Sequence, residues 1–222
     1  MTVDPHRVVL TGENPFIRLS VSEDGPVSTN ASYWRILFSP AGPGHVLYMK
    51  SELTDNRWRI YSDNIAMTRW LQETVQGMLN EETADTSIAV TEAEFSKYGD
   101  YRDFWTEQID AFEEELELTW YNPGDPVLIH TEPGDRPYGV CTVLVPVSGA
   151  RLTLNGVEAA GRPWPTTRTI RVGSAFSTGF PTLASSTWTR CWAATERSRA
   201  SPATRRTCSW SRPCASCAPT PT

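Results

Sequence analysis

Alternation of apolar and polar side chains dominates the first sixty residues and predicts short strands separated by turns. Ile17, Leu19 and Val21 alternate with polar neighbours, and the turn residues Asp24-Gly25-Pro26 follow them. The alternating stretches of this part of the chain are Phe16 to Ser22, Ser32 to Ser39, Leu47 to Lys50 and Arg57 to Tyr61.

The spacing of apolar residues then changes to three and four, which predicts one amphipathic helix over 64–79. Its apolar positions are Met67, Leu71, Val75, Met78 and Leu79. Asp63 is the expected N-cap, since a carboxylate accepts hydrogen bonds from unpaired amides of the first turn. The later stretch Arg102 to Phe112 fits a second, short helix better than a strand.

Strand patterns return after the long helix. They cover Ser87 to Ser96, Glu115 to Trp120, Val127 to Thr131 and Tyr138 to Val147, and end with a hairpin whose turn is Asn155-Gly156. About nine strands with short connections favour antiparallel pairing, because parallel strands need long crossovers. We therefore predict a mainly β fold for residues 1–164, an antiparallel meander that forms either a barrel or a two-sheet sandwich with one amphipathic helix.

The composition changes near Gly161. Residues 165–222 are a low-complexity tail of Arg, Ser, Thr, Ala, Pro and Cys without sustained apolar periodicity, and we predict that they are disordered or poorly packed. From Gly161 onward nine arginines face a single acid, Glu196, so this part has a net charge near +8 within a chain whose net charge is −6. The first 160 residues are therefore strongly acidic.

We interpret the tail as an out-of-frame translation of a GC-rich gene. Reading Thr187 to Arg197 from the third base of each codon gives a Val, Asp, Ala and Gly-rich sequence that is typical of ordinary protein. A genuine disordered basic tail and a folded cysteine module are the alternatives. Sequencing the locus distinguishes them, since an intact reading frame excludes the first interpretation.

Charge and composition exclude several classes of function. The acidic main part argues against nucleic acid and anionic membranes as partners, because phosphate binding needs clustered cations. No apolar run approaches the roughly 20 residues of a membrane span, so we expect a cytoplasmic protein. His6, His45 and His130 show no metal-ligand spacing, and nucleotide-binding motifs are missing, so we expect neither a metal nor a cofactor. The sequence does not indicate an oligomeric state.

Two opposed polar faces supply the candidate site residues. Arg35, Arg59 and Tyr61 belong to early strands with basic and Tyr-rich polar faces, whereas later strands carry glutamates. These groups either form a solvated surface with cross-strand ion pairs or converge on an anionic or phenolic ligand. Trp34, Trp58 and Trp120 either fill the core or line a site for a flat apolar ligand.

The predicted function is binding of a small, partly apolar or aromatic molecule. The candidate ligand-binding residues are Trp34, Arg35, Trp58, Arg59, Tyr61 and Trp120. A cofactor-independent isomerase, lyase or hydratase is the alternative, with Glu94, Asp110 and His130 as candidate acid-base groups. An interaction domain without a pocket is a third hypothesis, and it predicts a filled core and an exposed apolar patch.

Overall fold

The computed structural model describes residues 8–131, 138–164 and 185–193. The strands in these ranges are β1 (Val8–Glu13), β2 (Phe16–Ser20), β3 (Val27–Phe38), β4 (Gly44–Ser51), β5 (Arg59–Ser62), β6 (Val90–Glu92), β7 (Glu94–Asp100), β8 (Phe104–Ala111), β9 (Glu114–Pro123), β10 (Val127–Thr131), β11 (Tyr138–Leu154), β12 (Val157–Glu158) and β13 (Ser185–Ala193). The helical segments are α1 (Ile65–Leu71), a π-helical segment (Gln72–Gln76), α2 (Gly77–Leu79) and short 3-10 turns at Glu52–Thr54 and Glu81–Ala84.

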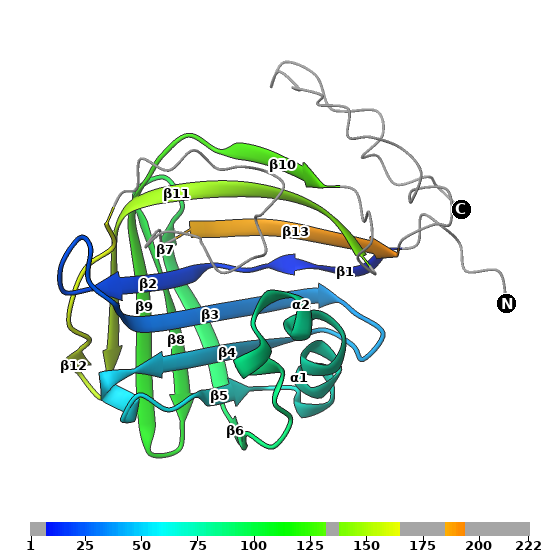
Figure 1. Cartoon of the computed structure of the whole chain (residues 1–222), viewed down its shortest axis with the longest axis horizontal. Helices are drawn as coiled ribbons and strands as arrows, with labels where there is room; N and C mark the ends of the chain where they lie inside the picture. Colours follow the sequence, from blue (N-terminus) through cyan, green and yellow to red (C-terminus); the bar gives the residue numbers. More distant parts are fainter. Residues whose placement is uncertain (1–7, 132–137, 165–184, 194–222) are drawn as a thin grey trace, which may run out of the picture.

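The strands form two connected sheets, so the predicted mainly β, antiparallel class is confirmed. The hydrogen-bonded order is β6-β5-β4-β3-β1-β13-β11-β9-β8-β7, and β2, β10 and β12 pair beside this path. Strands β7 to β9 run across the direction of β2 to β5 (Figure 1). In the described part of the chain the path stays open between β6 and β7, so the fold is sandwich-like and not a closed barrel.

Strand β11 joins the two sheets. Its first half, Tyr138 to Pro146, pairs with β13, and its second half, Val147 to Leu154, pairs with β9. The strand bends between these halves (Figure 1). We call the sheet that contains β1 to β6 the first sheet and the sheet that contains β7 to β9 the second sheet. A strand that passes from one sheet to the other is the usual way in which crossed sheets form a corner.

Two apolar cores separate three layers. One core lies between the sheets and includes Trp105 and Trp120, whose rings stack with centroids 5.2 Å apart. The other lies between the first sheet and the helix and includes Met67 and Leu71. Strand β3 supplies both cores, because Tyr33 faces the second sheet and Trp34 faces the helix. Both faces of this strand are therefore buried, as expected for the middle layer of three.

The helix occupies the predicted place with one local difference. Asn64, and not Asp63, caps it by accepting a 3.0 Å hydrogen bond from the Met67 amide. The Asp63 carboxylate is held instead by the His45 amide at 2.6 Å. In the π-helical segment the buried Gln72 side chain donates to the carbonyls of Thr83 and Asp85, which ties the following loop to the helix. No described helix is long and apolar enough to cross a membrane.

Two of the structural predictions are wrong, one on an element and one on the direction of a strand pair. The expected short helix at Arg102 to Phe112 is strand β8, in which Trp105, Glu107 and Ile109 are buried at a period of two. The expectation of antiparallel pairing throughout also fails at one place, since β5 pairs with β6 in parallel. The intervening helix provides the crossover that this parallel pair requires.

One stretch of the tail that was predicted to be disordered forms a strand. Strand β13 lies between β1 and β11 and pairs antiparallel with both. Its sequence, Ser-Ser-Thr-Trp-Thr-Arg-Cys-Trp-Ala, contains the Thr and Trp residues that favour strands. The cysteine pair Cys214 and Cys217 and the remainder of the basic tail lie outside the described residues. The boundary at residue 164 therefore stays a prediction.

Candidate functional site

Three neighbouring strands of the first sheet place ionisable side chains in one row. Glu13 of β1 is directly opposite Arg35 of β3, and Arg35 is directly opposite His45 of β4. Directly opposed residues project from the same face of a sheet. Tyr33 lies two positions before Arg35 and belongs to the core between the sheets. The row therefore faces the second sheet.

The second sheet presents complementary charges to this row. Lys97 of β7 is directly opposite Glu107 of β8. Trp105 and Ile109 flank Glu107 at a spacing of two, and both belong to the core between the sheets. Glu107 therefore projects inward with them. We call Glu13, Arg35, Lys97, Tyr101 and Glu107 the inter-sheet charge cluster.

Short contacts join all members of the inter-sheet charge cluster. The Arg35 guanidinium lies 3.1 Å from a Glu13 carboxylate oxygen and 3.2 Å from a Glu107 oxygen, so one cation bridges two acids. The Lys97 Nζ lies 3.6 Å from Glu107 and 4.0 Å from Glu13. The Tyr101 hydroxyl donates to Glu13 at 3.2 Å and also contacts the Lys97 ammonium group. Arg35 and Lys97 balance the two carboxylates in charge.

Burial shifts the proton affinities of two cluster members in opposite senses. The Glu107 side chain is 1% exposed, and this burial raises the pKa of its carboxyl although Arg35 and Lys97 lie close. Burial also lowers the pKa of the Lys97 ammonium, against the attraction of Glu107 and Glu13. Desolvation disfavours the charged form of each group. A carboxyl that retains its proton and an amine that loses its proton more readily are the forms that acid-base and nucleophilic chemistry use.

One buried donor beside the cluster lacks a partner. The Trp105 indole Nε1 is buried without a hydrogen bond in the part of the chain that the structure describes, whereas the buried Tyr33 hydroxyl interacts with Arg35 and Glu107. Most buried polar groups in proteins are paired, so unpaired ones point to strain, water or a ligand. The Trp105 ring also contacts the Tyr101 ring, with centroids 5.0 Å apart and planes tilted by 44°.

A histidine and an aspartate adjoin the cluster. The His45 Nδ1 lies 2.5 Å from an Asp63 carboxylate oxygen, and the other oxygen accepts the His45 amide. The imidazole ring stacks on Phe95 of β7, with centroids 5.2 Å apart and planes 18° apart. A carboxylate at Nδ1 fixes the orientation of the ring and leaves Nε2 for other partners.

The structure distributes the predicted ligand-binding residues over several places. Arg35 belongs to the inter-sheet charge cluster. Arg59 and Tyr61 both bind Glu114 at the start of β9, and the tyrosine hydroxyl donates to its carboxylate at 2.7 Å. Trp120 is buried between the sheets, and its indole donates to the Phe16 carbonyl at 3.1 Å.

The other two tryptophans pack in the core between the first sheet and the helix. Trp34 is buried between the first sheet and the helix, and Trp58 packs against that core and donates to Glu82 at 2.5 Å. The structure therefore does not bring Trp34, Trp58 and Trp120 together on one face.

The predicted acid-base residues lie apart from the inter-sheet charge cluster. Glu94 and Asp110 are exposed and directly opposite each other on β7 and β8. His130 is exposed on β10. The sequence interpretation missed Glu13, Lys97, Tyr101 and Glu107. One signal was present, because Glu107 stands between Trp105 and Ile109 at strand spacing, where a charge on an apolar face is unusual.

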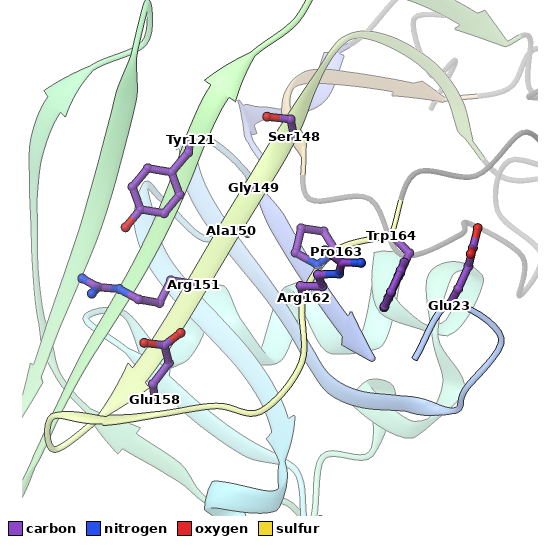
Figure 2. A pocket seen from close by; sticks show the side chains of 10 residues that line it. All are labelled: Glu23, Tyr121, Ser148, Gly149, Ala150, Arg151, Glu158, Arg162, Pro163 and Trp164. Carbon is purple, nitrogen blue, oxygen red and sulfur yellow. The ribbon is translucent and has the colours of Figure 1, made fainter. Parts of the chain in front are cut away.

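A separate cleft lies beside the corner that β11 forms. Its volume is about 660 Å³, and its lining combines two arginines, two glutamates, two aromatic residues and small residues of β11. These residues are Glu23, Tyr121, Ser148, Gly149, Ala150, Arg151, Glu158, Arg162, Pro163 and Trp164. Tyr121 and Arg151 project on one side of β11, whereas Pro163, Trp164 and Glu23 lie on the other (Figure 2). Within residues 8–131, 138–164 and 185–193, no group of three His, Cys, Asp or Glu residues could hold a metal ion.

Comparisons with known proteins assign no family. No family model matches the chain, and no curated protein sequence matches it. Among solved structures, the chain is similar to an acetoacetate decarboxylase from Legionella pneumophila, with 11% sequence identity, a TM-score of 0.36 and 86% of each chain covered. That similarity is too low to indicate an activity.

Proposed function

We propose that the protein binds a small anionic molecule with a partly aromatic or apolar body at the inter-sheet charge cluster. The observation that carries this proposal is the uneven exposure of the cluster. The side chains of Arg35 and Lys97 are 23% and 19% exposed, whereas those of Glu13 and Glu107 are 6% and 1% exposed. A molecule that approaches from solvent therefore meets the two cations first, and an anion is the complementary ligand.

The surroundings of the cations suit a ligand with a flat body. Tyr101 is 42% exposed beside Lys97, and its ring packs at a tilt against Trp105. Such rings give contact area to an aromatic or planar group while the cations hold its charge. The unpaired indole Nε1 of Trp105 is a further donor for a bound molecule.

A purely structural role explains the inter-sheet charge cluster less well. Transfer of charges into a protein interior carries a desolvation penalty that often equals or exceeds the attraction between them. Apolar residues at these positions would extend the neighbouring core of Ile17, Leu118 and Trp120 without that penalty. Recognition of a ligand provides a reason for the network beyond stability.

Calorimetric titration of the full chain with phenylpyruvate tests the proposal. Phenylpyruvate combines a carboxylate, a carbonyl group and an aromatic ring. We expect binding that Arg35→Gln weakens by roughly tenfold or more, because a charge-assisted hydrogen bond is lost. Arg57→Gln is the control, since Arg57 is an exposed arginine of a turn. Equal affinities for the wild type and Arg35→Gln would refute the proposed site.

Acid-base catalysis without a cofactor is a second candidate function. The contact between Lys97 and Glu107, with pKa values shifted in opposite senses, favours it. A neutral Lys97 amine can attack the carbonyl carbon of a ligand, and loss of one water molecule then gives an imine. The raised pKa of Glu107 favours its carboxyl as the group that gives a proton to the departing oxygen.

Reductive trapping tests this second candidate. Phenylpyruvate and borohydride should together add the reduced ligand to a peptide that contains Lys97, and mass spectrometry should locate it there. Lys97→Met should abolish the adduct at this peptide. An adduct that is unchanged in Lys97→Met, or no adduct in the wild type, would exclude imine formation at this residue.

A further inference from the structure

We infer that the cleft beside β11 is a second ligand site, and that it takes a zwitterion with an aromatic side chain, of the α-amino acid class. The residues that line this cleft do not overlap with the inter-sheet charge cluster. Its volume of about 660 Å³ lies within the usual range of about 300 to 1,000 Å³ for small-molecule sites. This site therefore stands independently of the function proposed above.

The cleft offers uncompensated charge of both signs. Arg162, Glu158 and Glu23 are exposed, and none of them forms an ion pair within the described residues. The fourth charged residue, Arg151, lies 3.8 Å from Glu117 of β9. An anion alone would meet two glutamates, and a cation alone would meet two arginines. A ligand with one carboxylate and one ammonium group satisfies both sets.

Backbone contacts hold the Arg162 side of the cleft in place. Residues Ser20 and Arg162 exchange two backbone hydrogen bonds of 3.2 and 3.1 Å, and the Trp164 indole donates to the Ser20 carbonyl at 3.0 Å. The Arg162 guanidinium lies 3.8 Å from the centroid of the Trp164 ring. Stacking on an indole restricts an arginine, so less entropy is lost when its fork binds a carboxylate.

The uncharged lining of the cleft accommodates a ring. Gly149 and Ala150 offer little side-chain bulk over β11, and Tyr121, Pro163 and Trp164 border them (Figure 2). The Tyr121 ring is itself held by stacking on Phe104, with centroids 6.4 Å apart. Rings at the sides of a flat floor give contact area to an aromatic group. The lining therefore favours an aromatic amino acid over a small aliphatic one.

Nuclear magnetic resonance of the ¹⁵N-labelled full chain tests the inference at a single group, the indole N–H of Trp164, assigned with Trp164→Phe. The probes are L-phenylalanine and three analogues that each lack one of its groups. The analogue 3-phenylpropanoate lacks the ammonium group, phenethylamine lacks the carboxylate, and L-alanine lacks the ring. We expect L-phenylalanine to shift the Trp164 signal in a saturable way. Each analogue should bind about tenfold more weakly or worse, because one charge-assisted contact or the ring contact is missing.

Variants assign the two charge contacts. Arg162→Gln, and separately the double variant Glu23→Gln with Glu158→Gln, should each weaken L-phenylalanine about tenfold, whereas Arg57→Gln should leave its affinity unchanged. All of these side chains are exposed, so the variants should keep the wild-type melting temperature. The inference is overturned if L-phenylalanine leaves the Trp164 signal unmoved, if the analogues bind equally well, or if Arg162→Gln binds like the wild type.

Discussion

Glu107 is the residue on which the inter-sheet charge cluster depends most. It is almost fully buried and contacts both Arg35 and Lys97. Glu107→Gln leaves two cations without their deepest partner, so we expect a loss of about 3 to 5 kcal/mol in the free energy of unfolding. Glu82→Gln is the matched control, because its pair with Lys50 is exposed and should contribute about 1 kcal/mol or less. Similar losses for both variants in urea unfolding would contradict the special position of Glu107.

Lys97 should give the protein a defined pH dependence. Burial lowers its pKa in the folded state, so between that lowered value and about 10.4 the unfolded chain binds more protons than the folded one. Stability from this residue therefore rises with pH across that window. The charged and titratable groups that face Lys97 are Glu13, Arg35, Glu107 and Tyr101. All four are present both in the wild type and in a Lys97→Met variant, so a difference between these two proteins reports on Lys97 itself.

The measurement is urea unfolding of the wild type and Lys97→Met at several values between about pH 7 and about pH 10.4. The free energy of unfolding of the wild type, relative to the variant, should increase with pH. A difference that stays constant or decreases over this range would show that burial does not disfavour the charged amine.

The end of β7 and the turn that follows it position Lys97 and Tyr101. Gly99 has a φ of +100°, and a Cβ there would lie 2.6 Å from the Phe104 carbonyl oxygen. Gly99→Ala should therefore destabilise the protein by about 1 to 3 kcal/mol and weaken phenylpyruvate binding. Gly77→Ala is the opposite case, because φ is −57° and a Cβ meets open space, so it should stabilise the helix by about 0.4 to 1 kcal/mol. Thermal melts of both variants should move in opposite directions.

Elements with one dominant period could be predicted from the sequence. The helix over 64–79 and the Asn155-Gly156 hairpin were predicted because spacing and turn chemistry agree there. Strand β8 was missed because Phe104, Trp105, Ile109 and Phe112 also fit a helical spacing, and the inward charge of Glu107 hides the strand period. Pairing with β7 and β9 decides between these periods, and the sequence does not show that pairing.

The candidate site illustrates the same limit. Arg35 was singled out because it stands on a basic strand face. Its partners Glu13, Lys97 and Glu107 come from strands that are distant in sequence, and only the crossing of the two sheets brings them together. The sequence also does not show whether Trp34 and Trp120 face the same core, because this depends on how the sheets and the helix are layered.

For the whole molecule, strand β13 is the most consequential addition to the sequence interpretation. It separates β1 from β11 within the sheet, so a chain that ends at Trp164 would expose both of these edges. We expect this shortened chain to melt at a lower temperature and to aggregate. A chain that ends at Ala193 keeps every described residue and should melt close to the full chain. Equal melting temperatures and a monodisperse Trp164 form in sedimentation would contradict the placement of β13.

Calorimetry of phenylpyruvate with the full chain, Arg35→Gln, Lys97→Gln and Arg57→Gln tests most directly whether Arg35 and Lys97 receive an anionic ligand between the sheets. We expect saturable binding by the wild type and Arg57→Gln, and a loss of about tenfold or more in Arg35→Gln and in Lys97→Gln, provided that each variant retains a cooperative melt. Absence of binding by the wild type, or full affinity in either Arg35→Gln or Lys97→Gln, would contradict this site.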